Sequence, residues 1–359
     1  MSIVVIYKKY RNLQITQIVF RQNVQMCAYY AQIIQDTIKF CKCLLIYCND
    51  AVIIKTVKSL TYLQIFILRL VITMNLADYN TLMKVLHSEG FNTKKSLGQN
   101  FLVDPEVCPR MAEFACDKNT GALEIGPGAG VLTRELCDAA KRVVTIELDE
   151  RLRPVLKKTL ADKDNVEVIF GDAMKIDLAA LIKEKFADCE RVAVCANLPY
   201  YITSPIIMML LESKLPIDNL TVMVQKEAAE RLCAEVGSRD AGAVTVAVNY
   251  YAESEILFEV DRSCFMPPPN VDSAVIKLSI REKPEIDLKD EKAFFRFVKA
   301  CFAQRRKTLV NTVSASMGIS KETLREALVD SGLPETARAE SLTMNQLAQI
   351  SDYIFTKEK

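Results

Sequence analysis

The chain has 359 residues, half of them hydrophobic, and its 46 basic and 45 acidic residues leave a formal net charge of +1. This length allows two or three domains with ample apolar content for a core, and the balanced charge excludes a surface coated in positive charge. The twelve cysteines form no Cys-x-x-Cys pair and the single histidine no cluster, which excludes metal-ligand spacing and favours a reduced, cytoplasmic protein without a metal.

The first 74 residues differ in composition from the rest. They contain no glycine or proline, and nine basic residues stand against two acidic ones. Their longest apolar stretch, Leu60–Met74, is shorter than the ~18–20 residues of a membrane-spanning helix, and signal-peptide features are absent. We therefore expect residues 1–74 to be an extension that is disordered or not native, with Met74 as the true start. The alternative is an amphipathic helix on a membrane surface.

The next part of the chain has the pattern of an α/β domain. An amphipathic helix is predicted over Met74–Glu89, where apolar residues recur at helical spacing. From Thr120 to Ser279, strand-like apolar runs alternate with helical patterns, which favours βαβ units around a mostly parallel sheet. The charged stretch Arg281–Asp290 is the predicted linker, and the remainder has a strongly helical pattern.

A glycine-rich loop follows the first predicted strand. Gly126, Gly128 and Gly130 stand between a short apolar run and a helical pattern that begins at Val131. Glycines at these positions let the backbone turn sharply and approach a ligand beside a helix N-terminus. The triplet alone is weak evidence, because tight turns use the same residues.

Acidic residues end the next two predicted strands. The strand Arg142–Asp149 carries Glu147, about 20 residues after the loop, where an acid typically accepts hydrogen bonds from both ribose hydroxyls of a nucleoside. The strand Val166–Phe170 is followed by Asp172 and Ala173, and this Asp is positioned to accept the amino group of an adenine. Three successive strand ends therefore predict a site for an adenine nucleoside cofactor.

A fourth strand end carries a motif suited to chemistry on a planar amino group. Asn197, Leu198, Pro199 and Tyr200 follow the apolar run Arg191–Ala196. The Asn oxygen and a neighbouring backbone carbonyl can accept both amino hydrogens and favour a pyramidal, nucleophilic nitrogen, while the proline holds that carbonyl in place. The tyrosine offers a face on which an extruded base can stack, worth about 1–3 kcal/mol.

The cofactor is either a dinucleotide or S-adenosylmethionine. Hydride transfer needs an acid or base near the substrate, and the only histidine, His87, lies outside this region. Methyl transfer to an amine needs alignment and an acceptor site, which Asn197 and Tyr200 fit. S-adenosylmethionine is therefore the favoured cofactor.

From about Asn92 to its C-terminus, the chain resembles the KsgA-type small-subunit ribosomal RNA adenine N6-dimethyltransferases. The motifs that carry the resemblance are Lys95–Leu102, Glu124–Gly130, Gly171–Ala173, Asn197–Pro205, Met223–Glu227, Phe265–Ser273 and Phe302–Leu309. The resemblance implies a Rossmann-like, S-adenosylmethionine-dependent methyltransferase domain at 75–282 and a helical RNA-binding domain at 283–359. It further implies dimethylation of two adjacent adenosines in the 3′-terminal hairpin loop of 16S rRNA, within a partly assembled small subunit.

The resemblance also assigns site residues. Phe265 is expected to stack on the target base opposite Tyr200. The implied cofactor contacts are Gln99, Asn100, Leu102, Gly126, Gly128, Glu147, Asp172, Ala173 and Asn197. Because the part after Met74 is net acidic, RNA affinity must come from local basic patches. The candidates are Lys94, Lys95, Lys226, Arg305, Arg306 and Lys307, the last three flanked by Phe302 and Leu309 in helical spacing.

Smaller expectations concern residues around these motifs. Glu124 either lies near the cofactor or bonds backbone in the glycine loop, and Tyr201 is expected to pack into the domain rather than stack on RNA. Two other functions stay open. A macrolide-resistance enzyme would methylate large-subunit rRNA, but that group usually reads Asn-Ile-Pro-Tyr, whereas Leu198 stands here. A ribosome-assembly factor would act mainly by binding. A monomer is expected.

Overall fold

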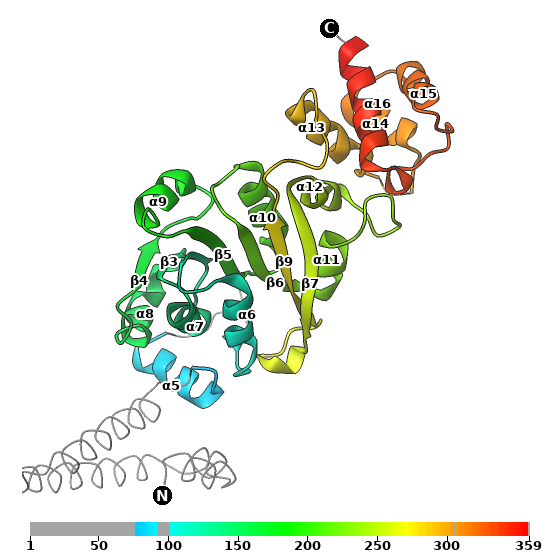
Figure 1. Ribbon diagram of the computed structural model, residues 1–359. Helices are drawn as coiled ribbons and strands as arrows, with labels where there is room; N and C mark the ends of the chain where they lie inside the picture. Colours follow the sequence, from blue (N-terminus) through cyan, green and yellow to red (C-terminus); the bar gives the residue numbers. More distant parts are fainter. Residues whose placement is uncertain (1–75, 92–100, 305, 358–359) are drawn as a thin grey trace, which may run out of the picture. The chain divides into compact units, whose positions relative to one another are not determined.

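A computed structural model describes residues 76–91, 101–304 and 306–357 (Figure 1). The predictions for residues 1–74 and for Lys94, Lys95, Gln99, Asn100 and Arg305 lie outside these ranges. Within them, no helix is both long and apolar enough to cross a membrane.

Seven strands form the main sheet, in the spatial order β4-β3-β2-β5-β6-β9-β7. They are β2 (Thr120–Ile125), β3 (Arg142–Glu147), β4 (Val166–Phe170), β5 (Arg191–Asn197), β6 (Asn219–Gln225), β7 (Ala252–Val260) and β9 (Ser273–Ile280). Neighbouring strands from β4 to β6 are parallel, and β9 pairs antiparallel with both β6 and β7. The predicted mostly parallel sheet is confirmed, and β3 ends two residues earlier than expected. A second, two-stranded sheet pairs β1 (Phe101–Leu102) with β8 (Phe265–Met266).

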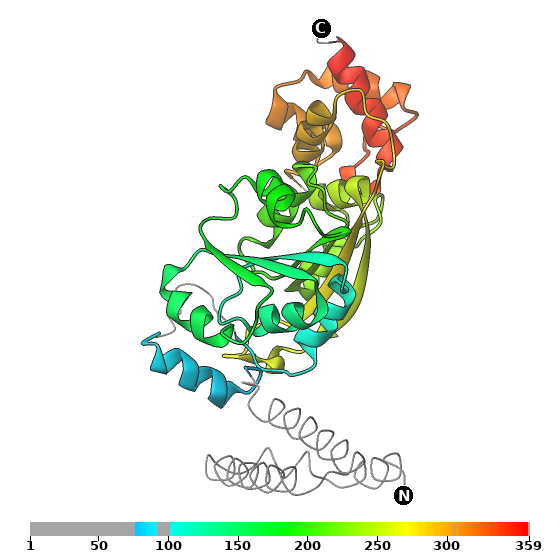
Figure 2. The same cartoon turned by 60° about the vertical axis from the view of Figure 1, so that its left-hand side comes forward.

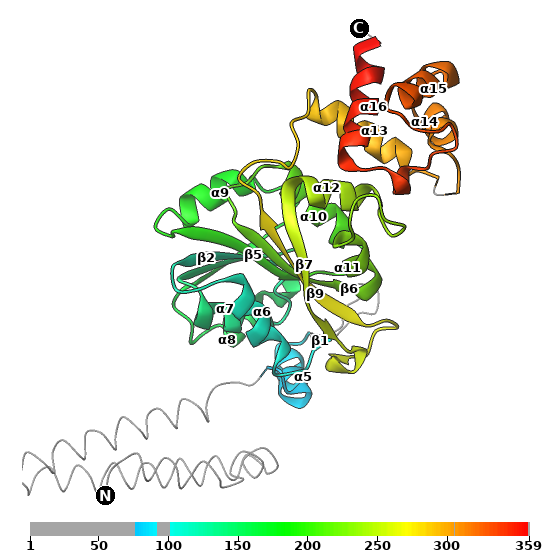
Figure 3. The same ribbon diagram turned by 45° about the vertical axis from the view of Figure 1, so that its right-hand side comes forward.

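Helices cover both faces of the main sheet (Figure 3). They are α6 (Val107–Ala115), α7 (Val131–Ala139), α8 (Arg153–Thr159), α9 (Leu178–Lys185), α10 (Thr203–Glu212), α11 (Lys226–Leu232) and α12 (Ala243–Tyr251). A further helix, α5 (Tyr79–Ser88), packs against α8. The short 3₁₀ turns η2 (Glu150–Leu152) and η3 (Arg262–Cys264) lie between them. The helix α5 begins at Tyr79 rather than Met74, because the Asp78 carboxylate caps it by accepting the Thr81 N–H.

The central strands are buried on both faces, so their side chains alternate between two cores. Leu123 and Val194 belong to the larger core, which also includes residues of α9, α10 and α12. Ala122 and Cys195 belong to the smaller core, with α6 and α7. This double burial explains why these strands are continuous apolar runs in the sequence.

The C-terminal part contains α13 (Glu291–Cys301), α14 (Leu309–Met317), α15 (Lys321–Asp330), η4 (Ala339–Ser341) and α16 (Met344–Lys357), drawn in orange to red in Figure 2. Its buried residues, such as Phe297 and Leu347, continue the larger core. Residues 281–290 form neither helix nor strand, as the charged stretch predicts. Beyond this segment, the Tyr251 hydroxyl donates to Glu291 Oε1 at 2.6 Å and joins α12 to the start of α13.

Candidate cofactor and substrate site

One pocket of about 160 Å³ opens at the carboxyl ends of β2, β3 and β5. The chain continues from β2 to β3 on one side and returns to β5 on the other, so this is the switch point where open α/β sheets bind ligands. The pocket brings together nine residues that the sequence predicts for the site: Leu102, Gly126, Gly128, Glu147, Asn197, Leu198, Pro199, Tyr200 and Phe265.

The glycines of the loop serve two different purposes. Gly128 lines the pocket with a φ of +58°, a left-handed conformation that side-chain-bearing residues rarely adopt, and its N–H donates to Glu147 Oε2 at 3.1 Å. Gly130 caps α7 with a φ of +87°, and a Cβ there would lie 3.1 Å from Thr159 Oγ1. Gly130 thus admits the end of α8, whereas Gly128 shapes the pocket wall.

Glu147 is the buried carboxylate at the end of β3. Besides Gly128, the N–H of Asp149 donates to its Oε1 at 2.8 Å. Burial raises the pKa of Glu147, although these two backbone hydrogen bonds act in the opposite direction. Since each carboxylate oxygen has two lone pairs, both oxygens retain capacity to accept further hydrogen bonds from a ligand.

Asp172 and Ala173 lie outside the lining of this pocket. Asp172 accepts the Met174 N–H at 3.0 Å and pairs with Lys175 at 3.3 Å, while Ala173 is buried in the larger core. They follow β4, the edge strand of the sheet, two strands away from β2. The structure therefore places them beside the next strand end rather than within the cavity itself.

The Asn197–Tyr200 segment is held by hydrogen bonds on both sides. The Pro199 carbonyl accepts the Ile202 N–H at 3.1 Å and the Thr203 hydroxyl at 3.2 Å, which commits it to the start of α10. The Tyr200 hydroxyl lies 2.9 Å from Ser273 Oγ, at the start of β9. Asn197 itself is the last residue of β5, partly buried, with its side chain at the pocket.

Phe265 lies in β8, where it pairs with Leu102 of β1, and both residues line the pocket. Its side chain is only 2% exposed. Phe265 and Tyr200 thus line the same pocket, and Phe265 also belongs to the smaller core.

Glu124 is a pocket residue for which the sequence left two alternative positions open. It lines the pocket with 1% of its surface exposed, and burial raises its pKa to about 8. The expectation that it bonds the glycine-loop backbone is wrong, because its Oε2 lies 2.6 Å from the Thr133 hydroxyl on α7. This contact joins the end of β2 to the first turn of the helix that the loop precedes.

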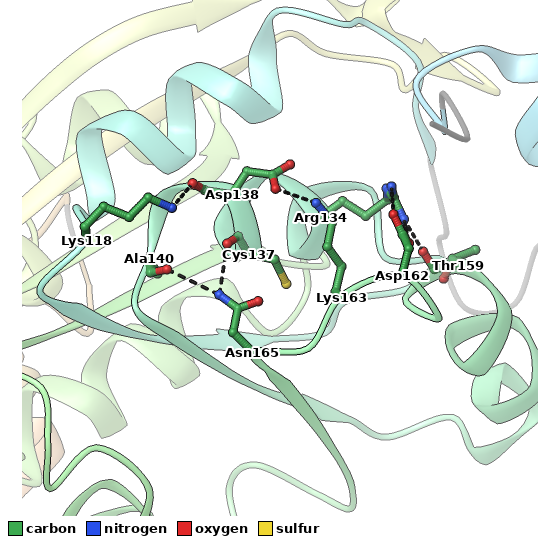
Figure 4. Close-up of polar contacts among 9 residues, drawn as sticks. All are labelled: Lys118, Arg134, Cys137, Asp138, Ala140, Thr159, Asp162, Lys163 and Asn165. Atoms are coloured by element: carbon green, nitrogen blue, oxygen red, sulfur yellow. Dashed lines mark hydrogen bonds and ion pairs between the residues drawn. The ribbon is translucent and has the colours of Figure 1, made fainter. Parts of the chain in front are cut away.

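A second contact network anchors the same helix (Figure 4). The Arg134 guanidinium, in the first turn of α7, donates to the Thr159 carbonyl at 2.5 Å and to both Asp162 oxygens at 2.6 and 2.8 Å. At the other end, Asn165 donates to the carbonyls of Cys137 and Ala140. Carbonyls at a helix C-terminus lack intrahelical partners, so the second contact caps α7, while the first holds α8 against it.

Replacing Arg134 with methionine is expected to lower the free energy of unfolding by about 3 kcal/mol, because it leaves a buried carbonyl and a carboxylate without their partner. Urea unfolding of the full chain measures the loss. The matched control is Arg325→Met, whose ion pairs on α15 are exposed and worth at most about 1 kcal/mol. Equal losses in the two variants would contradict a stabilising role for the Arg134 contacts.

The basic candidates are placed differently from one another. Lys226 begins α11 and pairs with Glu259 at 2.7 Å, so its charge is already compensated. Arg306 and Lys307 are exposed, but they lie in the connection between α13 and α14. The predicted helical spacing across this segment is therefore wrong: α13 ends at Cys301, and the Leu309 N–H that starts α14 donates to Ala337.

Two large side chains beside the motifs are exposed to solvent, which the sequence did not predict. Leu148 directly follows Glu147 and is 67% exposed. Tyr201 directly follows Tyr200 and is also 67% exposed, so the expectation that it packs into the domain is wrong. A sequence carries no signal that separates two adjacent tyrosines, one lining a pocket and one facing solvent.

The eight cysteines of the described ranges are free, and four of them are buried. No group of three His, Cys, Asp or Glu side chains in this part of the chain is arranged to hold a metal ion.

Comparisons with known proteins agree with this geometry. The family model "Ribosomal RNA adenine dimethylase" matches residues 90–356. "Ribosomal RNA small subunit methyltransferase A" from Bacillus licheniformis is 45% identical over 273 residues, covering 75% of this chain and 94% of the relative. The protein of that name from Geobacillus thermodenitrificans is 47% identical over 273 residues, covering 75% and 93%.

Two crystal structures are similar over most of their own length. The 23S rRNA methyltransferase ErmE is 28% identical with a TM-score of 0.53, covering 71% of this chain and 100% of that one. A dimethyladenosine transferase from Plasmodium falciparum is 28% identical with a TM-score of 0.54, covering 69% and 94%. The Rossmann-like methyltransferase fold expected from the sequence is thus confirmed.

Proposed function

Because this chain belongs to the ribosomal RNA adenine dimethylase family, we propose that it dimethylates N6 of two adjacent adenosines in the 3′-terminal hairpin loop of 16S rRNA. The relatives that share 45–47% identity carry the name of a small-subunit enzyme, whereas the 23S rRNA enzyme ErmE shares 28%. This difference favours the small subunit over the large one. The activity would then take place in the cytoplasm, where ribosomal subunits are assembled.

A single observation carries the proposal. The glycine loop, Glu147 and the Asn197–Tyr200 segment come from three different strand ends, and they line one pocket. A nucleoside-binding acid and an amine-orienting motif therefore share one cavity, as group transfer from a bound nucleoside to an amine requires.

The residues of the pocket fit S-adenosylmethionine. Glu147 is held by the N–H groups of Gly128 and Asp149 and keeps lone pairs free for two ribose hydroxyls. Leu102 lies in the same wall, while Asp172 and Ala173 at the next strand end stay predicted contacts of the adenine. Gln99 and Asn100 stay predicted contacts as well. When bound, the cofactor supplies an electrophilic methyl group on a sulfonium.

The acceptor side of the site orients the amino group of the target adenine. Both lone-pair positions of the Pro199 carbonyl are taken by Ile202 and Thr203, so the neighbouring carbonyl that can accept an amino hydrogen is that of Leu198. Asn197 accepts the second hydrogen, which exposes the nitrogen lone pair. The extruded base would lie between Tyr200, whose hydroxyl is hydrogen-bonded to Ser273, and Phe265.

We assign RNA binding to the helical segment 283–359 together with the catalytic part. Replacing Arg306 and Lys307 with glutamate is expected to weaken rRNA binding, most strongly at low salt, because both side chains are exposed cations. The slope of the logarithm of the RNA-binding constant against the logarithm of salt concentration should decrease in magnitude by about 1–2. The affinity for the cofactor should be unchanged. The control is Lys157→Glu with Lys183→Glu, an equal charge change on α8 and α9. Unaltered RNA binding in the Arg306 and Lys307 variant would refute this patch.

The decisive experiment incubates the full chain with labelled S-adenosylmethionine and, separately, unmethylated small-subunit particles and large-subunit rRNA. Nuclease digestion and mass spectrometry then locate N6,N6-dimethyladenosine. Label in two adjacent adenosines of the small-subunit particle is the expected result. Label only in the large-subunit rRNA would move the protein to the macrolide-resistance group. Cofactor binding without any label would favour an assembly factor that acts by binding.

A further inference from the structure

Exposed apolar side chains directly follow two residues that line the pocket: Tyr201 follows Tyr200, and Met266 follows Phe265. Nine large hydrophobic residues of the described ranges are exposed, and Tyr201, Met266 and Val271 are three of them. Tyr201 lies after β5, Met266 ends β8, and Val271 lies between β8 and β9; the Tyr200–Ser273 hydrogen bond joins the segment after β5 to the start of β9. Apolar surface concentrated beside a binding site is typical of a contact surface for a partner.

The backbone around Tyr201 is fixed although its side chain faces solvent. On one side, Tyr200 is bound to Ser273, and on the other, Ile202 donates its N–H to the Pro199 carbonyl. The Tyr201 side chain is 67% exposed. A rigidly mounted aromatic ring presented to solvent loses little conformational entropy when it binds a flat partner.

We propose, on the basis of the function proposed above, that Tyr201 is the platform on which the nucleotide next to the target adenosine stacks. Tyr200 lines the pocket, and the next residue, Tyr201, faces solvent about 3.8 Å further along the backbone, so the two rings are offered to two consecutive bases. The second adenosine of the pair is held at the rim while the first is in the pocket. Met266, which follows Phe265 of the pocket lining, adds a further exposed apolar side chain.

This arrangement addresses a requirement of the reaction. An extruded base leaves its neighbours without a stacking partner, and an aromatic face replaces that partner whatever the base. The pocket then determines specificity for adenine. Stacking on Tyr201 determines how tightly the RNA loop is held between the successive methyl transfers. Loss of one such stacking contact corresponds to about a 5- to 150-fold loss of affinity.

The test compares Tyr201→Ala and Tyr201→Phe in the full chain, with unmethylated small-subunit particles as substrate. The alanine variant is expected to raise KM for the particle 5- to 150-fold, and to accumulate products methylated at only one of the two adenosines. Its affinity for S-adenosylmethionine should be unchanged. The phenylalanine variant keeps the ring and should behave like the unmodified chain. Tyr79→Ala, on α5, is the control for removing an exposed tyrosine elsewhere.

Two results would overturn the platform. One is a KM and product pattern of Tyr201→Ala equal to those of the unmodified chain. The other is a Tyr201→Phe defect as large as that of alanine, which would assign the effect to the hydroxyl. Failure of the proposed function would instead appear as no methyl transfer by the unmodified chain. In that case, equal binding of small-subunit particles by the unmodified and Tyr201→Ala chains would still overturn the platform.

Discussion

Replacing Asn197 with alanine is expected to lower kcat for methyl transfer by at least about 100- to 1000-fold, the usual loss when one preorganised polar group is removed from the reacting centre. Asn197 is the last residue of β5 and lines the pocket. The Pro199 carbonyl cannot replace its oxygen as an acceptor, because it already accepts hydrogen bonds from Ile202 and Thr203. Without the Asn197 oxygen, one amino hydrogen of the target has no partner, and the nitrogen lone pair stays conjugated with the ring.

Single-turnover kinetics with saturating cofactor and RNA isolate this effect from binding. The affinity for rRNA should remain nearly unchanged, and the unfolding transition should match that of the unmodified chain. Asn311→Ala, an exposed position on α14, controls for loss of an amide side chain. A variant at position 197 that still methylates at the normal rate would show that amine activation does not depend on this oxygen.

The catalytic sheet was predictable because its central strands are buried on both faces. The strand Thr120–Ile125, for example, is short, fully buried and followed directly by a glycine, so its carboxyl end can be located in the sequence. Parallel strands end on the same edge, and this rule brings Gly128, Glu147 and Asn197 to one pocket without any knowledge of contacts.

Side-chain partners were not predictable in the same way. The Glu124–Thr133 contact and the Arg134 network depend on how α7 and α8 lie on the sheet, which periodicity does not specify. Tyr201 and the basic segment at 306–307 show a second limit. Whether residues share a helix face, and where adjacent side chains point, both depend on where the helix ends. Helix ends are fixed by tertiary contacts, such as the hydrogen bond from the Leu309 N–H to Ala337.

Glu124 is an acid of the pocket wall with a strongly shifted pKa. Its carboxyl is 1% exposed, and burial raises its pKa from 4.5 to about 8, with a further contribution from the nearby Glu147 carboxylate. The Thr133 hydroxyl opposes this shift without cancelling it. The folded protein therefore keeps a neutral Glu124 at neutral pH, and repulsion between the two acids of the pocket is reduced.

This environment makes stability depend on pH in a defined direction. In the unfolded chain the carboxyl loses its proton near its ordinary pKa of 4.5, whereas in the folded chain it keeps the proton up to about pH 8. Between these values the folded state binds more protons, so the free energy of unfolding falls as pH rises, by up to about 1.4 kcal/mol per pH unit from this group. The contribution is complete below pH 4.5 and is lost above pH 8.

Glu124→Gln is therefore expected to stabilise the protein above pH 8 by about 5 kcal/mol while leaving stability near pH 4.5 unchanged. Glutamine is neutral at every pH and its oxygen can still accept the Thr133 hydroxyl. Urea unfolding of both chains from pH 4.5 to 8.5 measures the difference, and Glu113→Gln, an exposed acid on α6, is the control. Parallel pH profiles for the two chains would mean that Glu124 ionises in the folded state as readily as in the unfolded one. A widening gap with rising pH would show that Glu124 stays protonated in this wall of the folded pocket.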